Sequence, residues 1–200
     1  MIDATFVPEA DAQKKVQHLW PKTQILCLLG HTRSGKTHSA FALALRDKRR
    51  PIWLMRPTVA CGESLGFEPG DINEKLKPWL MPFEDVLTGI SFVKMSRMLE
   101  SEEVAPVSMA HLRGRTVRGT LIVDEAQNLS YNQLKCVLTR LVDSGKVVLC
   151  GDPGQSDLGP KPPILKVVQK LQGVEGVEVV WFKEEDCKRS EIVKRVAKLL

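Results

Sequence analysis

The chain of 200 residues is 43% hydrophobic and 26% charged, a balance typical of a soluble globular domain. No apolar run approaches the ~20 residues of a membrane span, and the polar, acid-containing start MIDATFVPEADAQKK is unlike a secretory signal. We therefore expect one domain over residues 1–200, in the cytoplasm and not in a membrane. The net charge of +5 weakly favours an anionic partner such as nucleic acid.

Four or five short apolar runs predict strands along the chain. They are continuous rather than alternating, as expected for a parallel sheet with both faces covered. Helical patterns lie between several of them, and this succession predicts a three-layer α/β domain with a mainly parallel sheet. The runs are QILCLLG (24–30), IWLM (52–55), TLIVD (120–124), KVVLCG (146–151) and VEVVWF (177–182).

The helical patterns include two clear stripes in the C-terminal half. From Ser130, apolar residues recur with helical spacing up to Leu141. Ser130 and Gln133 form a capping box at the start of this helix, and Gly145 suits its far end. Residues 192–200 carry the second apolar stripe.

The five cysteines include no C-x-x-C pair, and three of them lie in apolar segments. We therefore expect free thiols in a reducing compartment rather than disulfides or a zinc site. The cysteines are Cys27, Cys61, Cys136, Cys150 and Cys187.

The motif GHTRSGKT (30–37) stands between the first apolar run and an alanine-rich helical pattern. In that setting the spacing G-x-x-x-x-G-K-[ST] predicts a loop whose backbone N–H groups cradle nucleotide phosphates. Lys36 would reach the β- and γ-phosphates, and the Thr37 hydroxyl would bind Mg²⁺. Arg33 stands where many such loops have Gly, and its side chain restricts the backbone. The residues expected to bind the nucleotide are Gly30, His31, Thr32, Arg33, Ser34, Gly35, Lys36, Thr37 and His38.

Two further motifs follow predicted strands. In LIVDEAQN (121–128), Asp124 is the expected Mg²⁺ partner, and Glu125 is placed to orient or deprotonate the attacking water. The alternative is that both acids only cap the next turn. In LCGDPGQSDL (149–158), Gln155 would contact the γ-phosphate or that water, unless the segment is an ordinary turn.

In this order, GHTRSGKT, LIVDEAQN and GDPGQSDL resemble the core of the PhoH-like ATPases, which are relatives of superfamily 1 helicases. The segment RPTVACGESLGFEPGDINEKLKPWLMPFEDVL (56–87) is similar to that family's signature of RP, GE, LGF, PGD, EK and a final D-x-L. It is rich in Gly and Pro, and so long an irregular segment in a compact domain is usually functional. The motif RGRT (113–116) also precedes the acidic strand as in the family. The resemblance covers residues from about 25 to 195 and implies a RecA-like fold that uses ATP and Mg²⁺.

The resemblance also implies macromolecular partners. Some family members associate as rings and couple ATP hydrolysis to RNA unwinding, so RNA or single-stranded DNA and a homo-oligomer are expected, with a hexamer as one ring size. Arg189 lies where the family has an arginine that would reach a neighbouring subunit's nucleotide. The run DCKRS (186–190) departs from the family pattern, so Lys188 or Arg195 are alternatives, as is a solvated helix start.

A few polar residues are candidates for further contacts. Gln13, in the N-terminal segment 1–24, resembles the glutamine that pairs with adenine in helicase-like enzymes; a surface glutamine is the alternative. A basic cluster before the acidic strand fits a polynucleotide contact, and a solvated loop is the alternative there. The nucleic-acid candidates are Arg56, Arg113, Arg115 and Arg118.

These features favour an ATPase that acts on RNA or single-stranded DNA. Because the chain has one ATPase lobe where superfamily 1 enzymes have two, unwinding would require self-association. A nucleoside kinase resembling thymidine kinase also combines a phosphate loop with a D-E-A-Q run, but its paired C-x-x-C motifs are missing here. A slow ATP-binding scaffold is a further alternative. No N-K-x-D guanine motif appears, so ATP is expected rather than GTP.

Overall fold

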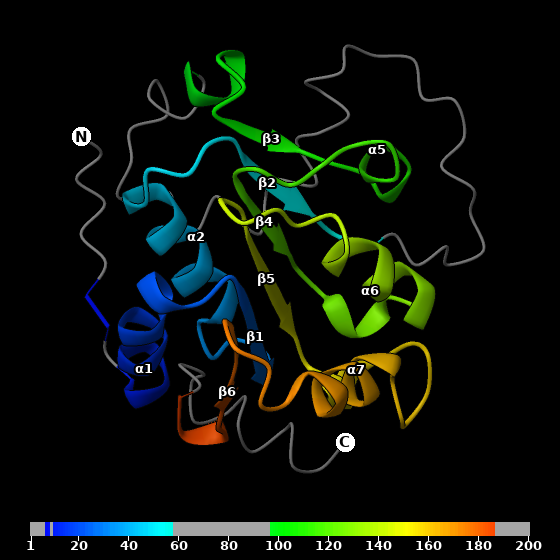
Figure 1. Ribbon diagram of the computed structural model, residues 1–200. Coiled ribbons are helices and arrows are strands. Elements are labelled where there is room, and N and C mark those ends of the chain that lie inside the picture. Colours follow the sequence, from blue (N-terminus) through cyan, green and yellow to red (C-terminus); the bar gives the residue numbers. More distant parts are fainter. Residues whose placement is uncertain (1–6, 9, 58–96, 187–200) are drawn as a thin grey trace.

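The computed structural model describes residues 7–8, 10–57 and 97–186. These residues form a six-stranded sheet of order β3-β2-β4-β5-β1-β6 (Figure 1). Every neighbouring pair is parallel, so all the carboxyl ends of the strands lie at one edge. The strands are β1 (Ile25–Gly30), β2 (Ile52–Met55), β3 (Val104–Pro106), β4 (Thr120–Val123), β5 (Lys146–Gly151) and β6 (Val177–Phe182).

The predicted strands are confirmed, and one strand was missed. β3 is three residues long and ends in Pro106, and so short a run gives no pattern that separates it from a loop. Among the described strands it pairs only with β2 and so lies at the edge of their sheet, the position where a residue without a backbone N–H is tolerated.

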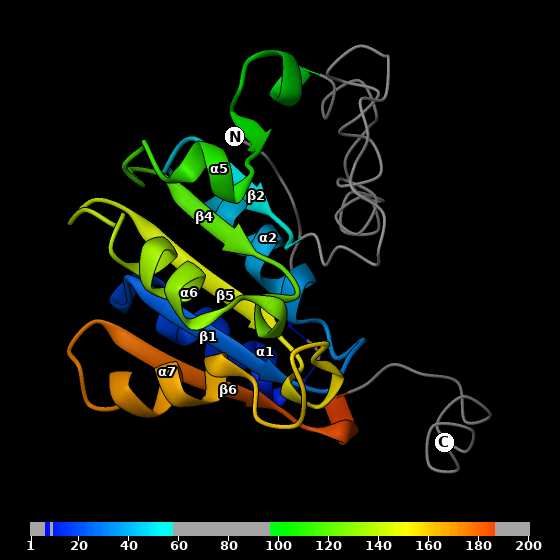
Figure 2. The same cartoon turned by 90° about the vertical axis from the view of Figure 1, so that its right-hand side faces the viewer.

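Helices cover both faces of the sheet. Side chains alternate along each strand, so Leu26 and Leu28 of β1 join one core cluster while Cys27 and Leu29 join the other. The first cluster packs under α1 and α2 and the second under α6 and α7 (Figures 1 and 2), which confirms the three-layer α/β class. The helices are α1 (Asp11–Leu19), α2 (Lys36–Arg46), α5 (Met109–Leu112), α6 (Tyr131–Leu138) and α7 (Pro163–Leu171), with short 3₁₀ turns η1 (Trp20–Lys22), η3 (Ala126–Asn128), η4 (Pro153–Gln155) and η5 (Glu184–Asp186).

Helix α6 has the predicted start but not the predicted end. The capping box is present: the Gln133 N–H donates to Ser130 Oγ at 3.3 Å, and the Ser130 N–H donates to Gln133 Oε1 at 2.8 Å. The helix ends at Leu138, where the Thr139 hydroxyl donates to the Lys135 carbonyl at 2.8 Å. Leu141 pairs instead with Val117 in an isolated β-bridge. The prediction of a helix that continues toward Gly145 was therefore wrong.

Three of the five cysteines lie within the described residues, while several other predictions fall outside them. Cys27 and Cys150 are buried and Cys136 is half-buried, and all three are free thiols; burial raises the pKa of Cys27 to about 12. Cys61, Cys187, the helix predicted over 192–200 and nearly all of the segment 56–87 lie outside the described residues. Among the described helices, none combines the length and apolar character that crossing a bilayer requires.

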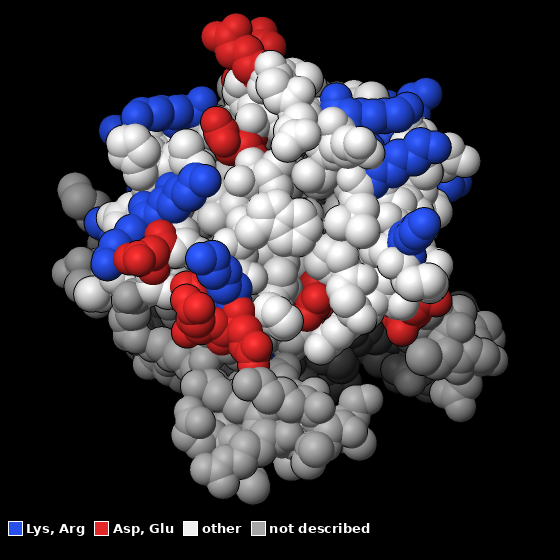
Figure 3. All heavy atoms as spheres, turned by 90° about the horizontal axis from the view of Figure 1, so that it is seen from below, with Lys and Arg blue, Asp and Glu red and all other residues white. Residues whose placement is uncertain are grey.

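The lower face of the molecule, as oriented in Figure 1, has an uneven distribution of charge. In Figure 3 the lysine and arginine side chains stand at the periphery of this face, around an uncharged centre. The excess positive charge is therefore not gathered into one continuous patch on this side.

Lys146, at the start of β5, is fully buried. Its Nζ donates to the Trp20 carbonyl at 2.9 Å and to the Thr23 carbonyl, and it lies 4.8 Å from the centroid of the Trp20 ring. The ammonium thus ties the end of the α1–η1 segment to the sheet. Burial lowers its pKa from 10.5 to about 8.

We expect Lys146 to make stability depend on pH in the alkaline range. The unfolded chain keeps its proton up to a pKa near 10.5, whereas the folded protein releases it near 8. Since the unfolded state then binds more protons, the free energy of unfolding should rise between these pH values relative to that of Lys146→Met. Urea denaturation at several pH values would test this, with Lys135→Met on the exposed face of α6 as the control. Parallel pH profiles for wild type and Lys146→Met would contradict it.

Candidate active site

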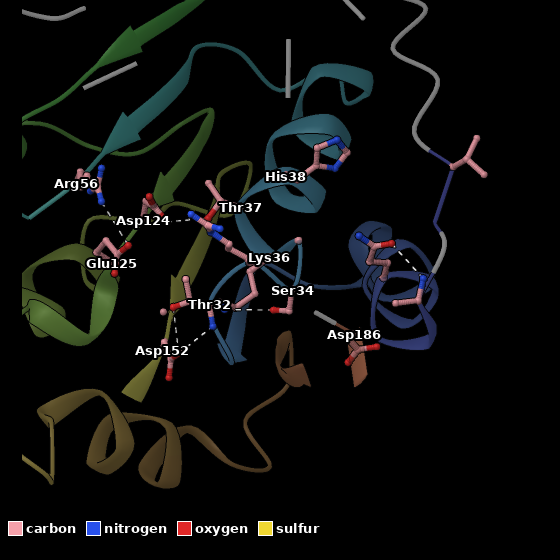
Figure 4. A pocket seen from close by; sticks show the side chains of 16 residues that line it. Thr32, Ser34, Lys36, Thr37, His38, Arg56, Asp124, Glu125, Asp152 and Asp186 are labelled. Carbon is pink, nitrogen blue, oxygen red and sulfur yellow. Dashed lines mark hydrogen bonds and ion pairs between the residues drawn. The ribbon is translucent and has the colours of Figure 1, made fainter. Parts of the chain in front are cut away.

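A pocket of about 630 Å³ lies at the carboxyl edge of the sheet (Figure 4). It is bounded by the loop between β1 and α2, by the residues after β2, β4 and β5, and by α1. Its position is the one at which open parallel α/β sheets hold their ligands. The lining residues are Val7, Ala10, Gln13, Thr32, Arg33, Ser34, Gly35, Lys36, Thr37, His38, Arg56, Asp124, Glu125, Gly151, Asp152 and Asp186.

The loop between β1 and α2 has the backbone of a phosphate-binding turn. Gly30, Arg33 and Gly35 have φ values of 123°, 61° and 87°. At Gly30 an added Cβ would lie 2.0 Å from the Phe182 carbonyl oxygen at the end of β6, so only glycine fits there. Arg33 has a left-handed backbone, a conformation that costs free energy for a residue with a side chain. This explains why Gly is common at that position.

Lys36 is the first residue of α2 and is 8% exposed. Its Nζ donates to the Gly30 carbonyl at 2.8 Å, to the His31 carbonyl and to Ser34 Oγ at 3.3 Å. Burial lowers its pKa, and the nearby acidic groups, Asp152 and Asp124 among them, oppose that shift. The ammonium is therefore held at the base of the phosphate loop and faces a group of carboxylates.

Thr37 and Asp124 meet between α2 and the end of β4. The Thr37 hydroxyl donates to Asp124 Oδ1 at 2.7 Å. Asp124 is 7% exposed, and burial raises the pKa of its carboxyl, while the Thr37 hydrogen bond and the charge of Arg56 lower it. A hydroxyl and a carboxylate oxygen side by side are the kind of donors that Mg²⁺ prefers, so these residues fit a magnesium site.

Glu125 is held on both carboxylate oxygens. Its Oε1 lies 3.4 Å from Arg56 Nη2, and its Oε2 accepts a 2.6 Å hydrogen bond from Gln127 Nε2. Its backbone is left-handed, with φ of 52°, because the chain turns sharply between β4 and η3. The side chain therefore lies beside Asp124 at the pocket wall (Figure 4).

Gln127 and Asp152 connect the strand ends, and sequence reasoning missed both. Gln127 is fully buried, and its Oε1 accepts from the Asp152 N–H at 3.0 Å. An added Cβ on Gly151 would lie 2.7 Å from that same oxygen. Asp152 Oδ2 in turn accepts from the Thr32 N–H at 2.9 Å. Both residues stand in motifs that the sequence singled out, but their contacts span 25 and 120 positions.

Several predicted site residues lie at the rim of the pocket or away from it. Gln13 is buried in α1 and lines the pocket, and its Oε1 accepts from the Ala10 N–H at 3.2 Å. Gln155 is exposed, and its Oε1 accepts from Thr32 Oγ1 at 2.6 Å, outside the pocket lining.

The predicted nucleic-acid residues do not lie together. The exposed residues Arg113, Arg115 and Arg118 precede β4, at the opposite end of that strand from Asp124. Arg189 lies outside the described residues. Arg56, which was expected to contact nucleic acid, lines the pocket.

The structure resembles a solved viral protein in its fold. The large terminase of a thermophilic bacteriophage superimposes with a TM-score of 0.59 over 96% of this chain and 50% of the terminase, at 15% identity. The structure of that terminase in complex with ADP gives a TM-score of 0.54 over 94% and 49% of the two chains, at 17% identity. Together with the parallel sheet, this shows a RecA-like P-loop fold.

Comparison with known sequences identifies the family. The model of the PhoH-like protein family matches residues 5–200. The chain is 34% identical to a PhoH-like protein of Bacillus subtilis (strain 168), over 84% of this chain and 55% of that protein. It is 36% identical to Protein PhoH of Escherichia coli (strain K12), over 86% and 51%. The chain spans about half the length of these curated relatives. The family match and these identities show that the chain belongs to the PhoH-like protein family.

Proposed function

We propose that the protein is a magnesium-dependent ATPase that couples hydrolysis to RNA or single-stranded DNA as a homo-oligomer. The observation that carries this proposal is the 2.7 Å hydrogen bond from Thr37 to Asp124. It brings the end of the phosphate loop and the acidic strand end to one point, with Glu125 beside them. Convergence of these groups on one triphosphate is what P-loop hydrolysis requires.

The loop and Lys36 would bind the phosphates. The loop's N–H groups and the start of α2 favour negative charge, and Lys36 is the buried cation within that loop. Its present acceptors are neutral oxygens of Gly30, His31 and Ser34, and a phosphate oxyanion is a stronger acceptor than these. Thr37 and Asp124 would hold Mg²⁺, which when bound supplies stabilisation of charge on the phosphate oxygens.

Glu125 would orient the attacking water and accept its proton. Its side chain is 34% exposed and lines the pocket, so it is accessible to water, and the 2.6 Å bond from Gln127 fixes its direction. The Asp152 and Gln155 side chains both contact Thr32 of the phosphate loop. A movement of the phosphate loop on binding a γ-phosphate would therefore shift the segment after β5 through these two contacts.

The adenine and polynucleotide assignments rest on other residues of the chain. Gln13 lines the pocket and would read the adenine edge with its amide. The net charge of +5 and the family membership favour a polynucleotide partner. Arg113, Arg115 and Arg118, which lie away from the pocket, would contact it. Arg189 would reach the nucleotide of the next subunit in an oligomer.

One set of assays tests the proposal. We expect phosphate release from ATP that stops with EDTA, and that poly(U) or oligo(dT) accelerates, with light scattering reporting a species larger than one chain. Phosphorylated thymidine in a parallel reaction would replace the proposal with a nucleoside kinase. Tight ATP binding without turnover under any of these conditions would leave only a scaffold.

A further inference from the structure

Arg56 makes an ion pair with Glu125 that differs from the other contacts of the site. It extends from the residue after β2, and its Nη2 alone approaches Glu125 Oε1, at 3.4 Å. The two side chains are 39% and 34% exposed. The other carboxylate oxygen is bound much more closely, at 2.6 Å, by the buried Gln127. The Glu125 carboxylate thus has one short hydrogen bond, from Gln127, and one long contact, with Arg56.

Arg56 lies on the far side of Glu125 from the phosphate loop. The sheet order places β4, which carries Glu125, directly beside β2, whereas β5 separates β4 from β1 and its loop. In Figure 4 Arg56 and Glu125 lie on one side of Asp124, and Lys36 lies on the other. Arg56 lines the same pocket as the loop, but at the end of the pocket formed by β2, with β4 and β5 between it and the strand of the loop. We therefore treat an anion bound to Arg56 as separate from the triphosphate that the loop would hold.

A phosphodiester would compete well for Arg56. The guanidinium fork binds phosphate through two parallel N–H···O bonds, and here the carboxylate uses one long contact. Both side chains are a third or more exposed, so solvent screens this half-buried ion pair and its contribution to the free energy is small. Exchange of the carboxylate for a phosphodiester is therefore easily reversible. A polynucleotide, the partner in the proposed function, carries such phosphodiesters, and its contact with Arg56 would be separate from those of Arg113, Arg115 and Arg118 at the opposite end of β4.

We propose that Arg56 is a positioning residue that restrains Glu125 until a polynucleotide phosphate binds Arg56 instead. While Arg56 binds Oε1 and Gln127 binds Oε2, both carboxylate oxygens are engaged, so Oε1 is not available to the attacking water. Once Arg56 is released, Glu125 keeps its direction through Gln127 and can receive the proton of the attacking water. This inference rests on the proposed function, because it concerns the rate of the same ATP hydrolysis.

The test compares ATP turnover of wild type and four variants with and without poly(U). Wild type should have a low basal kcat that poly(U) raises. Arg56→Ala should show a basal kcat about two- to fivefold higher, the range expected for loss of one solvent-screened ion pair, with KM for ATP little changed and no further response to poly(U). Arg56→Lys, which keeps the charge, should retain the low basal rate and part of the stimulation. Arg97→Ala, an exposed arginine outside the pocket lining, should behave as wild type.

Other outcomes would overturn the inference. A basal kcat of Arg56→Ala equal to or below that of wild type would show that Arg56 does not restrain Glu125. Retained stimulation in that variant would show that the polynucleotide acts elsewhere. Arg56→Met, measured beside it, guards against an effect peculiar to the truncated side chain. Wild type with magnesium-dependent turnover but no response to poly(U) would defeat this inference alone, whereas absence of turnover in every protein would defeat the proposed function.

Discussion

Replacing Glu125 with Gln is expected to lower ATP turnover by about 10²- to 10⁴-fold, the usual contribution of a general base. The amide keeps the size of the carboxylate and can still pair with Gln127, which bonds Glu125 Oε2 at 2.6 Å, but it cannot accept a proton from water. Binding of magnesium–ATP should remain, because Thr37, Lys36 and Asp124 are untouched. Single-turnover hydrolysis beside calorimetric titration with a slowly hydrolysed ATP analogue would separate the two effects.

The matched control is Glu178→Gln, an exposed residue of the edge strand β6. It removes one carboxylate without touching the pocket, so its turnover should equal that of wild type. Unchanged turnover in Glu125→Gln would remove Glu125 from the mechanism. A loss of ATP affinity in place of turnover would assign it to nucleotide binding.

Replacing Lys36 with Met is expected to weaken binding of magnesium–ATP by about 10- to 150-fold, as for loss of one hydrogen bond to a charged group. The methionine fills similar space at this buried position but has no ammonium to meet the phosphates. Calorimetric titration measures this directly, and Lys135→Met on the exposed side of α6 serves as the control. Equal affinities for Lys36→Met and wild type would mean that the loop binds no triphosphate through this residue.

The sequence predicted the strands because buried parallel strands are continuous apolar runs, as in TLIV and KVVLCG. It could not predict their order, since β1 lies between β5 and β6 through pairings far apart in the chain. The end of α6 was misplaced because Leu141 continues the apolar spacing, whereas the backbone of residues 140–142 hydrogen-bonds with Val117 and so leaves the helix.

The candidate site was predictable where a motif has fixed local spacing. Residues 32–37 of GHTRSGKT line the pocket together with the acids Asp124 and Glu125, whereas Gly30 and His31 lie outside its lining. The roles of Gln127 and Asp152 depend on contacts between separate strand ends, and no local pattern distinguishes a buried glutamine that bridges two loops from one that faces solvent. Arg56, which opens the RP motif, was expected to contact nucleic acid, and its contact with Glu125 follows from the adjacency of β2 and β4.

The strand that leads into the phosphate loop is flanked by β5 and β6, the last two strands along the described chain. The first residue of that loop, Gly30, is paired with Phe182 at the end of β6. A ribosome that has not yet reached β5 has therefore made every residue of GHTRSGKT but neither neighbour of its strand. Pairings of such long range are slow to form, so during synthesis the proposed binding of ATP would await β5 and β6, and a fragment without these strands would not bind the nucleotide.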